Sequence, residues 1–410
     1  KSMKPFSTYI KEEAEAPQEG EKLKHITHAE DRPLQSGAMG FKHAVTALKH
    51  THEITKSGGH SSHLSMKFDG SPSLVFGHHP ETGKFFVASK SAFNKTPKIN
   101  YTHDDIVKNH GHAPGLMAKL HSSLNHLKKV TPKTGVYQGD LMFSDNDEPG
   151  SKEERKVGKQ GVSFTPNTIQ YTAKGDQAEK VKKAKLGIVV HTQYHGDTAS
   201  SMRADPHVDL HNFKDHPDVW RLNPNHDTKN VHYSDTDQKE FNDHIKAAEA
   251  IHDKNKEQMY KITSPHAGEG GHLEQYINHT VRTDEKPSAE GLAKHIMGKY
   301  EKAAGKLKTP GAQAKKTTEG QSHVDYIKRN KKHYDNLLKM HNHLQQAKDV
   351  LVKTLNQHEA GLEHHVEIEG GKMKRTDPEG FVVHHPDVPT PTKLVNRKEF
   401  SKINLLKVRK

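Results

Sequence analysis

The most informative stretch of the sequence is Met66-Lys67-Phe68-Asp69-Gly70-Ser71-Pro72-Ser73. It contains the pattern Lys-x-Asp-Gly, and the apolar residues 74–76 that follow it favour a strand. A lysine becomes a nucleophile near neutral pH only when desolvation or neighbouring positive charge lowers the pKa of its ammonium group. Gly70 permits a tight turn, and Pro72 fixes the backbone after it. The stretch therefore predicts either a reactive Lys67 or an ordinary strand-end lysine beside an Asp-Gly turn.

Length and composition limit the class of protein. The chain has 410 residues, enough for two or three domains with a sizeable core. Only 31% of the residues are hydrophobic and 28% are charged, so we expect part of the chain to be extended helix or solvated loop. No apolar run is long enough to cross a bilayer, and no signal-peptide pattern opens the chain. These features predict a soluble cytoplasmic protein without a membrane partner.

The charge balance favours anionic partners. The chain has 63 lysines and arginines against 51 aspartates and glutamates, which gives a net charge of +12. Such an excess suits nucleic acid or nucleotide phosphates, although solubility alone would also explain it. The absence of cysteine excludes disulfides, thiolate zinc sites and cysteine nucleophiles. The 36 histidines are scattered and none forms an HExxH pattern, so we interpret them mostly as solvated polar residues.

Strand patterns dominate the first half of the chain. Residues 74–77 and 84–90 flank a turn that contains Pro and Gly, which predicts a β-hairpin. Residues 115–129 have apolar side chains at helical spacing and predict a packed amphipathic helix. A helix is also predicted over 40–55. Further strands are expected over three segments, namely 134–143, 164–171 and 186–192.

Helical patterns dominate from about residue 199 onward. Residues 239–262 and 324–358 carry apolar side chains at steps of three and four, as amphipathic helices do. Residues 305–320 are rich in Lys, Thr, Ala and Gly and predict a flexible loop between them. We interpret this block either as a structural helical hairpin or as a clamp on a polynucleotide. Strand patterns return at 377–383.

The pattern around Lys67 resembles motif I of the covalent nucleotidyltransferases, the superfamily of ATP-dependent DNA ligases, RNA ligases and mRNA-capping enzymes. In that family the motif I lysine attacks the α-phosphate of a nucleotide and carries the nucleotide as a phosphoramide. The resemblance implies that Lys67 is catalytic and that Asp69 and Gly70 contact the nucleotide. Ser89-Lys90, at the end of the expected hairpin, resembles motif Ia, a serine followed by a basic residue.

Three later segments resemble further motifs in the family's order. Asp140 stands among apolar strand residues where motif III usually has Glu, Glu379-Gly380 resembles motif IV, and Lys393 resembles the lysine of motif V. The sequence departs from the family at His384 and Val395, where basic residues are usual, and Arg397 and Lys398 are candidates to replace the second of these.

The resemblance also assigns ligands to these residues. Attack on an α-phosphate develops negative charge, so cations should surround it, including Lys90, Lys393 and Mg²⁺. Mg²⁺ prefers one or two carboxylates together with phosphate oxygens and water, which points to Glu379 and Asp140 as metal ligands. The implied cofactors are ATP and Mg²⁺. The implied nucleotide-binding residues are Asp69, Gly70, Lys90, Asp140, Glu379 and Lys393.

We therefore expect an α+β fold in which a ligase-type nucleotidyltransferase (adenylation) domain with antiparallel sheets is interrupted by an α-helical insertion. The expected parts are an N-terminal arm and helix (1–54), the first part of the nucleotidyltransferase domain (55–198), the insertion (199–370) and the second part (371–410). If this is correct, the last strands return to the sheet that holds Lys67.

The expected function is ATP-dependent polynucleotide ligation, in which AMP passes from Lys67 to a 5′-phosphate before a 3′-hydroxyl attacks. RNA ligation is favoured over DNA ligation because the Lys-x-Asp-Gly-Ser form is similar to that of some RNA ligases. The seventeen residues after Lys393 also leave no room for an appended OB-fold. The sequence looks like phage proteins of this superfamily, which suggests the cytoplasm of an infected bacterium. The alternatives are a nucleotidyltransferase with another acceptor and a non-catalytic nucleic-acid-binding or virion-associated protein.

Overall fold

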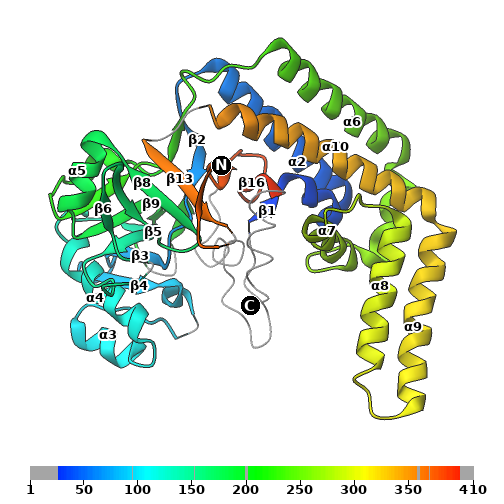
Figure 1. The fold of residues 1–410 in the computed structure, drawn as a ribbon, viewed down its shortest axis with the longest axis horizontal. Helices are drawn as coiled ribbons and strands as arrows, with labels where there is room; N and C mark the ends of the chain where they lie inside the picture. The colour runs from blue at the N-terminus through cyan, green and yellow to red at the C-terminus, as the bar shows by residue number, and fades with distance from the viewer. Residues whose placement is uncertain are drawn as a thin grey trace. The chain divides into compact units, whose positions relative to one another are not determined.

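The computed structural model describes residues 26–94, 96–151, 153–198, 202–357, 361–368 and 370–397. These residues form an α+β fold whose sheets are mainly antiparallel (Figure 1). The chain divides into two compact units. Unit 1 comprises Lys1–Ile26, Gly59–Asn230 and Asn356–His384, and unit 2 comprises Thr27–Gly58, Val231–Leu355 and His385–Lys410.

The largest sheet of unit 1 has the strand order β10-β9-β5-β3-β4, with β11 paired to β9. Adjacent strands in this order pair in antiparallel fashion, whereas β11 pairs with β9 in parallel fashion. The central strands are buried on both faces, and β3 and β4 accordingly consist mostly of apolar residues. The bounds are β3 (Ser73–His78), β4 (Phe85–Ser89), β5 (Val136–Ser144), β9 (Leu186–His195), β10 (Arg203–Asp205) and β11 (Val219–Leu222).

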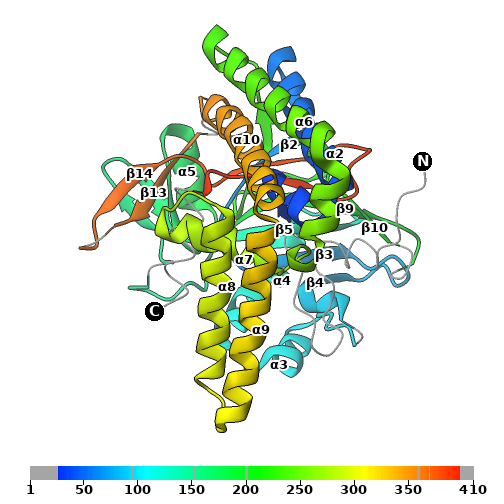
Figure 2. The same ribbon diagram turned by 90° about the vertical axis from the view of Figure 1, so that its right-hand side faces the viewer.

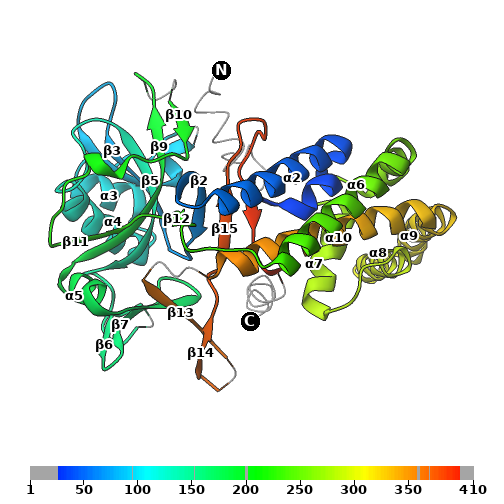
Figure 3. The same cartoon turned by 90° about the horizontal axis from the view of Figure 1, so that it is seen from above.

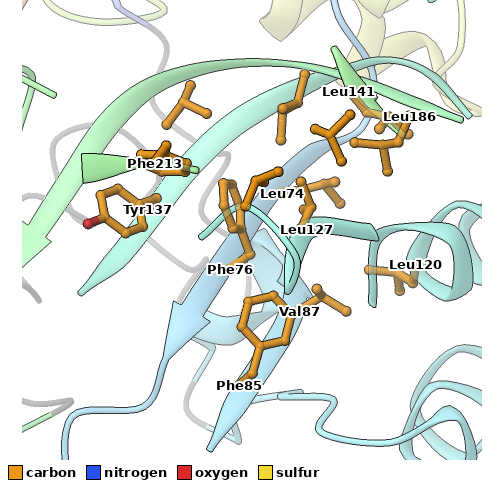
Figure 4. Close-up of a cluster of buried hydrophobic side chains, with 14 of the residues drawn as sticks. Leu74, Phe76, Phe85, Val87, Leu120, Leu127, Tyr137, Leu141, Leu186 and Phe213 are labelled. Carbon is orange, nitrogen blue, oxygen red and sulfur yellow. The ribbon is translucent and has the colours of Figure 1, made fainter. Parts of the chain in front are cut away.

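The main core of unit 1 lies between this sheet and α4 (Pro114–Leu127), which follows α3 (His103–His110). Figure 4 shows Leu74, Phe76 and Val87 from the strands facing Leu120 and Leu127 from the helix side. All five side chains are buried. Each such side chain contributes about 1.5–3 kcal/mol when it leaves water, so this core fixes the sheet on which the candidate site is built.

Two further sheets complete unit 1. One has the order β14-β13-β8-β7-β6, and Figure 3 shows its β13 and β14 as a hairpin. The other contains β12, β2 and β15, with β2 in the middle. The bounds are β2 (His60–Lys67), β6 (Lys156–Gly158), β7 (Gly161–Phe164), β8 (Ile169–Ala173), α5 (Gly175–Lys183), β12 (Asn225–Asp227), β13 (Leu362–Glu367), β14 (Met373–Thr376) and β15 (Gly380–Val383).

Unit 2 is mainly helical, and it also contains a short parallel pair of strands, β1 and β16. The helices α6 and α10 pack side by side, as do α8 and α9 (Figure 2). Serine or threonine side chains cap the starts of α6, α8 and α9. The bounds are β1 (Thr27–His28), α2 (Arg32–Ser57), α6 (Asp235–Thr263), α7 (His272–Thr283), α8 (Ala289–Ala304), α9 (Pro310–Arg329), α10 (Lys331–Leu355) and β16 (Thr392–Leu394), with 3-10 turns η1 (Ala29–Asp31) and η4 (Ser264–His266). Unit 1 has two such turns, η2 (Lys90–Phe93) and η3 (Leu210–Asn212).

Several predicted elements are confirmed. The hairpin is β3–β4, the helices expected near 40–55 and 115–129 are α2 and α4, and the strands expected at 134–143 and 186–192 are β5 and β9.

Other predictions of local structure are wrong. The loop expected over 305–320 is mostly helix, because Thr309 caps α9 and Pro310 occupies its first turn. The strand expected over 164–171 is the end of β7 and the start of β8, and the block expected to be helical from residue 199 begins with β10, β11 and β12. Most of the expected N-terminal arm, 1–25, lies outside the described residues.

Candidate active site

The candidate site is built on the pairing of β2 with β15. Lys67 is the last residue of β2, and Gly380 of β15 stands opposite it in the antiparallel register. Glu379 immediately precedes that glycine, so the register brings its carboxylate to the lysine. The Lys67 Nζ donates a hydrogen bond to Glu379 Oε2 over 2.7 Å. The two side chains are 29% and 7% exposed, respectively, so this ion pair is largely screened from water.

A second carboxylate approaches from β5. Asp140 stands opposite Ser73 of β3 and Val189 of β9. Its Oδ1 lies 3.6 Å from Nε2 of His191, which is on β9. Burial alone would raise the pKa of Asp140, but the interactions with His191 and Lys67 outweigh burial and lower it. Asp140 is therefore an anion at neutral pH.

Gly70 allows the loop after β2 to lie directly against β5. A Cβ atom at this position would lie 2.6 Å from Cβ of Asp140 and 3.0 Å from the carbonyl oxygen of Leu141. A side chain would therefore displace the backbone that carries Asp140. The close approach of two backbone segments, in addition to the turn, explains why glycine is needed here.

Asp69 organises a neighbouring loop. Its carboxylate accepts hydrogen bonds from the backbone N–H groups of Thr168 and Ile169, at 2.7 and 3.1 Å, and from Asn167 Nδ2 at 2.9 Å. The backbone N–H of Asp69 donates to the Tyr171 hydroxyl at 2.7 Å. Burial and the charge of Asp69 raise the pKa of Tyr171 well above its usual value. Asp69 thus fixes the β7–β8 turn beside Lys67, while its contact with a nucleotide stays a prediction.

Replacement of Asp69 should loosen this turn. We expect Asp69→Ala to destabilise unit 1 by about 1–3 kcal/mol, because two backbone donors lose a charged acceptor. Asp69→Asn retains one acceptor oxygen and should lose less. Trp220, the single tryptophan, packs against Phe164 beside this turn, so its fluorescence during urea unfolding reports the change. An Asp69→Ala protein with the wild-type unfolding midpoint would contradict this assignment.

The charge around Lys67 differs from the sequence-based expectation. Burial lowers the pKa of Lys67, but the charge and hydrogen bond of Glu379, together with the charges of Asp140 and Asp69, raise it above its usual value. Lys67 is therefore an ammonium group at neutral pH in this arrangement. Two of these carboxylates, Glu379 and Asp140, come from other segments of the chain, so the residues next to Lys67 in the sequence do not determine the direction of the shift.

Removal of one carboxylate should make Lys67 more reactive. We expect Glu379→Gln to lower the pKa of Lys67, since it removes the main interaction that stabilises the ammonium form. At a fixed pH near 8, the neutral fraction of the Lys67 amine rises about tenfold for each unit by which its pKa falls, so its rate of modification by an amine-directed reagent should rise as well.

Quantitative peptide mass spectrometry measures this rate at Lys67. The exposed Lys84, in the β3–β4 turn of the same unit, serves as the internal control. Equal reaction rates of Lys67 in the wild type and in Glu379→Gln would contradict the electrostatic account.

The carboxylates could take part in binding Mg²⁺. Three carboxylates, those of Asp69, Asp140 and Glu379, raise the pKa of Lys67. The site therefore has more negative than positive charge around this lysine, which suits a divalent cation. Throughout the described ranges, no group of three or more His, Asp or Glu side chains is arranged to hold a metal ion. A magnesium ion at Glu379 and Asp140 would therefore depend on phosphate and water oxygens for its remaining ligands.

Comparison with known proteins identifies the family of the chain. Residues 23–409 match a family described as "Family of unknown function (DUF6267)". The chain belongs to this family. No curated protein and no solved structure matches it. None of the helices that the structure describes has the length and apolar character needed to cross a membrane.

The two predicted phosphate-binding lysines of this DUF6267 member lie in different units. Lys90 is exposed at the start of η2 in unit 1, directly after β4. Lys393 is on β16 in unit 2, where it pairs in register with His28 of β1. The roles of both lysines in nucleotide binding stay predictions.

Covalent nucleotidyltransferases usually have basic residues at the positions of His384 and Val395, and neither residue is a cation at neutral pH in the described structure. Burial and nearby histidines lower the pKa of His384 to about 3, so its ring is neutral at pH 7. Val395 is buried, and Arg397 is buried in unit 2, where it donates to Asp31 at 2.8 Å. The replacement of the usual motif V lysine by Arg397 stays a prediction, and the contact with Asp31 already engages its guanidinium. Lys398, the other candidate, lies outside the described residues.

Sequence reasoning missed several residues of the site. His191 contacts Asp140, and Tyr171 and Asn167 contact Asp69. His191 gave a usable signal, since it is a polar residue that ends the apolar run of β9. Tyr171 gave none, because a tyrosine in a strand is ordinary and its hydroxyl partner is 102 residues away in the sequence.

Proposed function

We propose that the chain is an ATP-dependent polynucleotide ligase that carries AMP on Lys67. The observation that supports this proposal best is the 2.7 Å contact between Lys67 and Glu379, two residues that are 312 positions apart in the sequence. The presence of Asp140 and Asp69 around the same amine adds to it. Enzymes of phosphoryl transfer use a lysine at the phosphates and carboxylates that hold Mg²⁺, and this partly exposed site contains both residue types.

In the proposed first step, the neutral amine of Lys67 attacks the α-phosphorus of ATP. A P–N bond forms, and the bond between the α-phosphorus and the bridging oxygen breaks, so that pyrophosphate leaves with the electron pair. The ammonium group must lose a proton before it attacks. The Glu379 carboxylate is within hydrogen-bond distance of that proton and is our candidate for its acceptor.

In the second step, a 5′-phosphate oxygen of the polynucleotide attacks the same phosphorus, and the P–N bond breaks as Lys67 regains its proton. A 3′-hydroxyl then attacks the 5′-phosphorus, which forms the phosphodiester and releases AMP. Bound Mg²⁺ would neutralise charge that develops on the phosphate oxygens. Glu379 and Asp140 are its proposed ligands, Lys90 and Lys393 are proposed phosphate contacts, and RNA is the favoured substrate.

Incubation with α-labelled ATP and Mg²⁺, followed by denaturing electrophoresis, tests the first step. We expect a labelled protein band that is lost when pyrophosphate is added, because pyrophosphate reverses the reaction. Repeating the experiment with each of the four nucleoside triphosphates identifies the preferred base. Addition of 5′-phosphorylated RNA or DNA should then transfer the label to the nucleic acid.

One specific pair of observations favours a second candidate, a non-catalytic protein that binds nucleic acid. The pKa of Lys67 is raised, and His384 is neutral at a position where covalent nucleotidyltransferases usually have a basic residue. Absence of label with every nucleotide would support this candidate. Label that forms but never moves to RNA or DNA would instead indicate a transferase with another acceptor.

A further inference from the structure

The α8–α9 hairpin of unit 2 carries a concentration of positive charge at its tip, which we define as residues 294–316. The tip contains one acidic residue, Glu301, and no arginine. Its formal charge is +6, half of the net charge of +12 of the whole chain. The basic residues of the tip are Lys294, Lys299, Lys302, Lys306, Lys308, Lys315 and Lys316.

The two helices of the hairpin pack against each other, and the residues of the connecting loop are exposed to solvent. A Cβ atom on Gly320 of α9 would lie 2.6 Å from Cβ of Tyr300 on α8, so the two helices are in close contact there. Within unit 2, α7 and α10 pack against α8, and Figure 2 shows α8 and α9 running side by side to the connecting loop. Residues 305–311 at that loop are all exposed. A Cβ atom on Gly298 or Gly311 would meet no atom within 4 Å.

Most of the tip lysines have no acidic partner among the described residues. Lys316 forms an ion pair with Glu319 at 2.8 Å, and Lys299 donates to Gln275. The other five lysines are exposed, and none forms an ion pair with any residue that the structure describes. Clustered ammonium groups without partners repel one another, so their arrangement favours a bound polyanion.

We propose that this tip binds the phosphate backbone of nucleic acid without preference for base sequence. The inference rests on the proposed function and deepens it by naming a surface that holds the polynucleotide. Lys294 and Lys302, both on α8, are eight residues apart, which is ~12 Å along the helix axis. That length matches about three to four phosphates of one strand at ~3.4 Å each, and the loop lysines extend it, so the tip suits an extended polyanion better than a single anionic group.

The residue types at the tip argue for backbone contacts. Lysine is a flexible point charge that neutralises phosphates, whereas specific base recognition commonly uses the planar fork of arginine, which this segment lacks. The tip is also poorly suited to a membrane surface. Leu307, 38% exposed, is the one large apolar side chain that residues 301–318 present, whereas helices that bind membranes display a broad apolar face.

A charge-removal variant and a matched control test the proposal. The test variant combines Lys302→Gln, Lys306→Gln, Lys308→Gln and Lys315→Gln, all at exposed positions. The control combines Lys246→Gln, Lys254→Gln, Lys256→Gln and Lys261→Gln, four exposed lysines on α6 of the same unit. Glutamine has nearly the same helix propensity as lysine, so both proteins should fold, which far-UV circular dichroism verifies. A double variant, Lys306→Gln with Lys308→Gln, changes only the connecting loop and tests the same surface if the fourfold variant misfolds.

Fluorescence anisotropy with labelled single-stranded RNA and duplex DNA of unrelated sequences, over a range of salt concentrations, gives the result. We expect the test variant to bind about tenfold or more weakly at about 0.1 M salt. Its slope of log K against log salt should be smaller by about 2–4, because fewer counterions are released. The control should retain the wild-type slope and affinity.

Three results would overturn the proposal. Equal losses in the test variant and the control would mean that only total charge matters. Unchanged binding in the test variant would exclude the tip as a nucleic-acid-binding surface. Tip-dependent binding to phosphatidylserine vesicles or polyglutamate, but not to nucleic acid, would assign the tip to another partner.

Labelling with ATP needs no nucleic acid, so the test variant should form the lysyl adduct normally. Absence of the adduct together with tip-dependent binding would overturn the proposed ligase and leave the surface standing.

Discussion

Lys67→Arg should form no covalent adduct with α-labelled ATP, with a loss of about 10³-fold or more relative to the wild type. Arginine keeps its proton at all accessible pH values, so its guanidinium cannot supply the lone pair that attacks phosphorus. It can still pair with Glu379, which is 7% exposed and would otherwise be left as a nearly buried unpaired charge. The substitution therefore removes the nucleophile while it retains the ion pair. Labelled bands on denaturing gels give the measurement.

Lys84→Ala is the matched control for this experiment. Lys84 is an exposed lysine of the β3–β4 turn in the same unit, and it has no assigned role in the site. We expect it to label like the wild type. An adduct that persists in Lys67→Arg, or that mass spectrometry locates at another lysine, would contradict the assignment of Lys67.

Local sequence patterns selected Lys67 and Glu379, two residues that the structure brings into contact, but they did not predict the electrostatics around them. The neighbours of Lys67 along the chain, such as Leu64 and Met66, are apolar and carry no information about charged partners. The residues that determine its pKa lie across the sheets, because Gly380 pairs with Lys67 and Asp140 pairs with Ser73. Pairing between strands that are far apart in the sequence has no local signature, so the direction of the pKa shift could not be read from composition.

The mistake at the tip of the α8–α9 hairpin has a different cause. The Lys, Thr and Gly content of 305–320 suggested a flexible loop, yet the same residues include Thr309 followed by Pro310. A threonine N-cap with proline in the first turn is a helix-start signal, and lysine, alanine and glutamine are adequate helix formers. That helix start was therefore predictable from local sequence. The packing of α8 against α9 was not, since it depends on contacts such as those of Gly320 with Tyr300.

The most destabilising single change that we expect in unit 2 is Lys348→Met. The Nζ of Lys348, on α10, lies 2.6 Å from Oε1 of Glu30 in η1, and both side chains are fully buried. Arg397 lies 3.7 Å from the same carboxylate and 2.8 Å from Asp31. Burial alone would raise the pKa of Asp31, but Arg397 and His341 hold it well below its usual value. These contacts join α10 to residues near both ends of the described chain.

Methionine fills a similar volume but leaves Glu30 with less positive charge in a buried environment. Removal of one partner of a buried ion pair commonly costs about 3–5 kcal/mol, which would account for much of the stability of a typical domain. Urea unfolding followed by far-UV circular dichroism measures the loss in the helices of unit 2. Trp220 fluorescence follows unit 1 in the same experiment.

The double variant Lys348→Met with Glu30→Gln distinguishes an uncompensated charge from lost packing. It removes the stranded carboxylate, so it should recover a large part of the stability that Lys348→Met loses. Lys239→Met provides the control, since Lys239 pairs with Asp243 on the exposed face of α6 and should unfold like the wild type. If Lys348→Met also unfolds like the wild type, the buried pair contributes no net stability. If the double variant is less stable than the single variant, the loss comes from packing or hydrogen bonding.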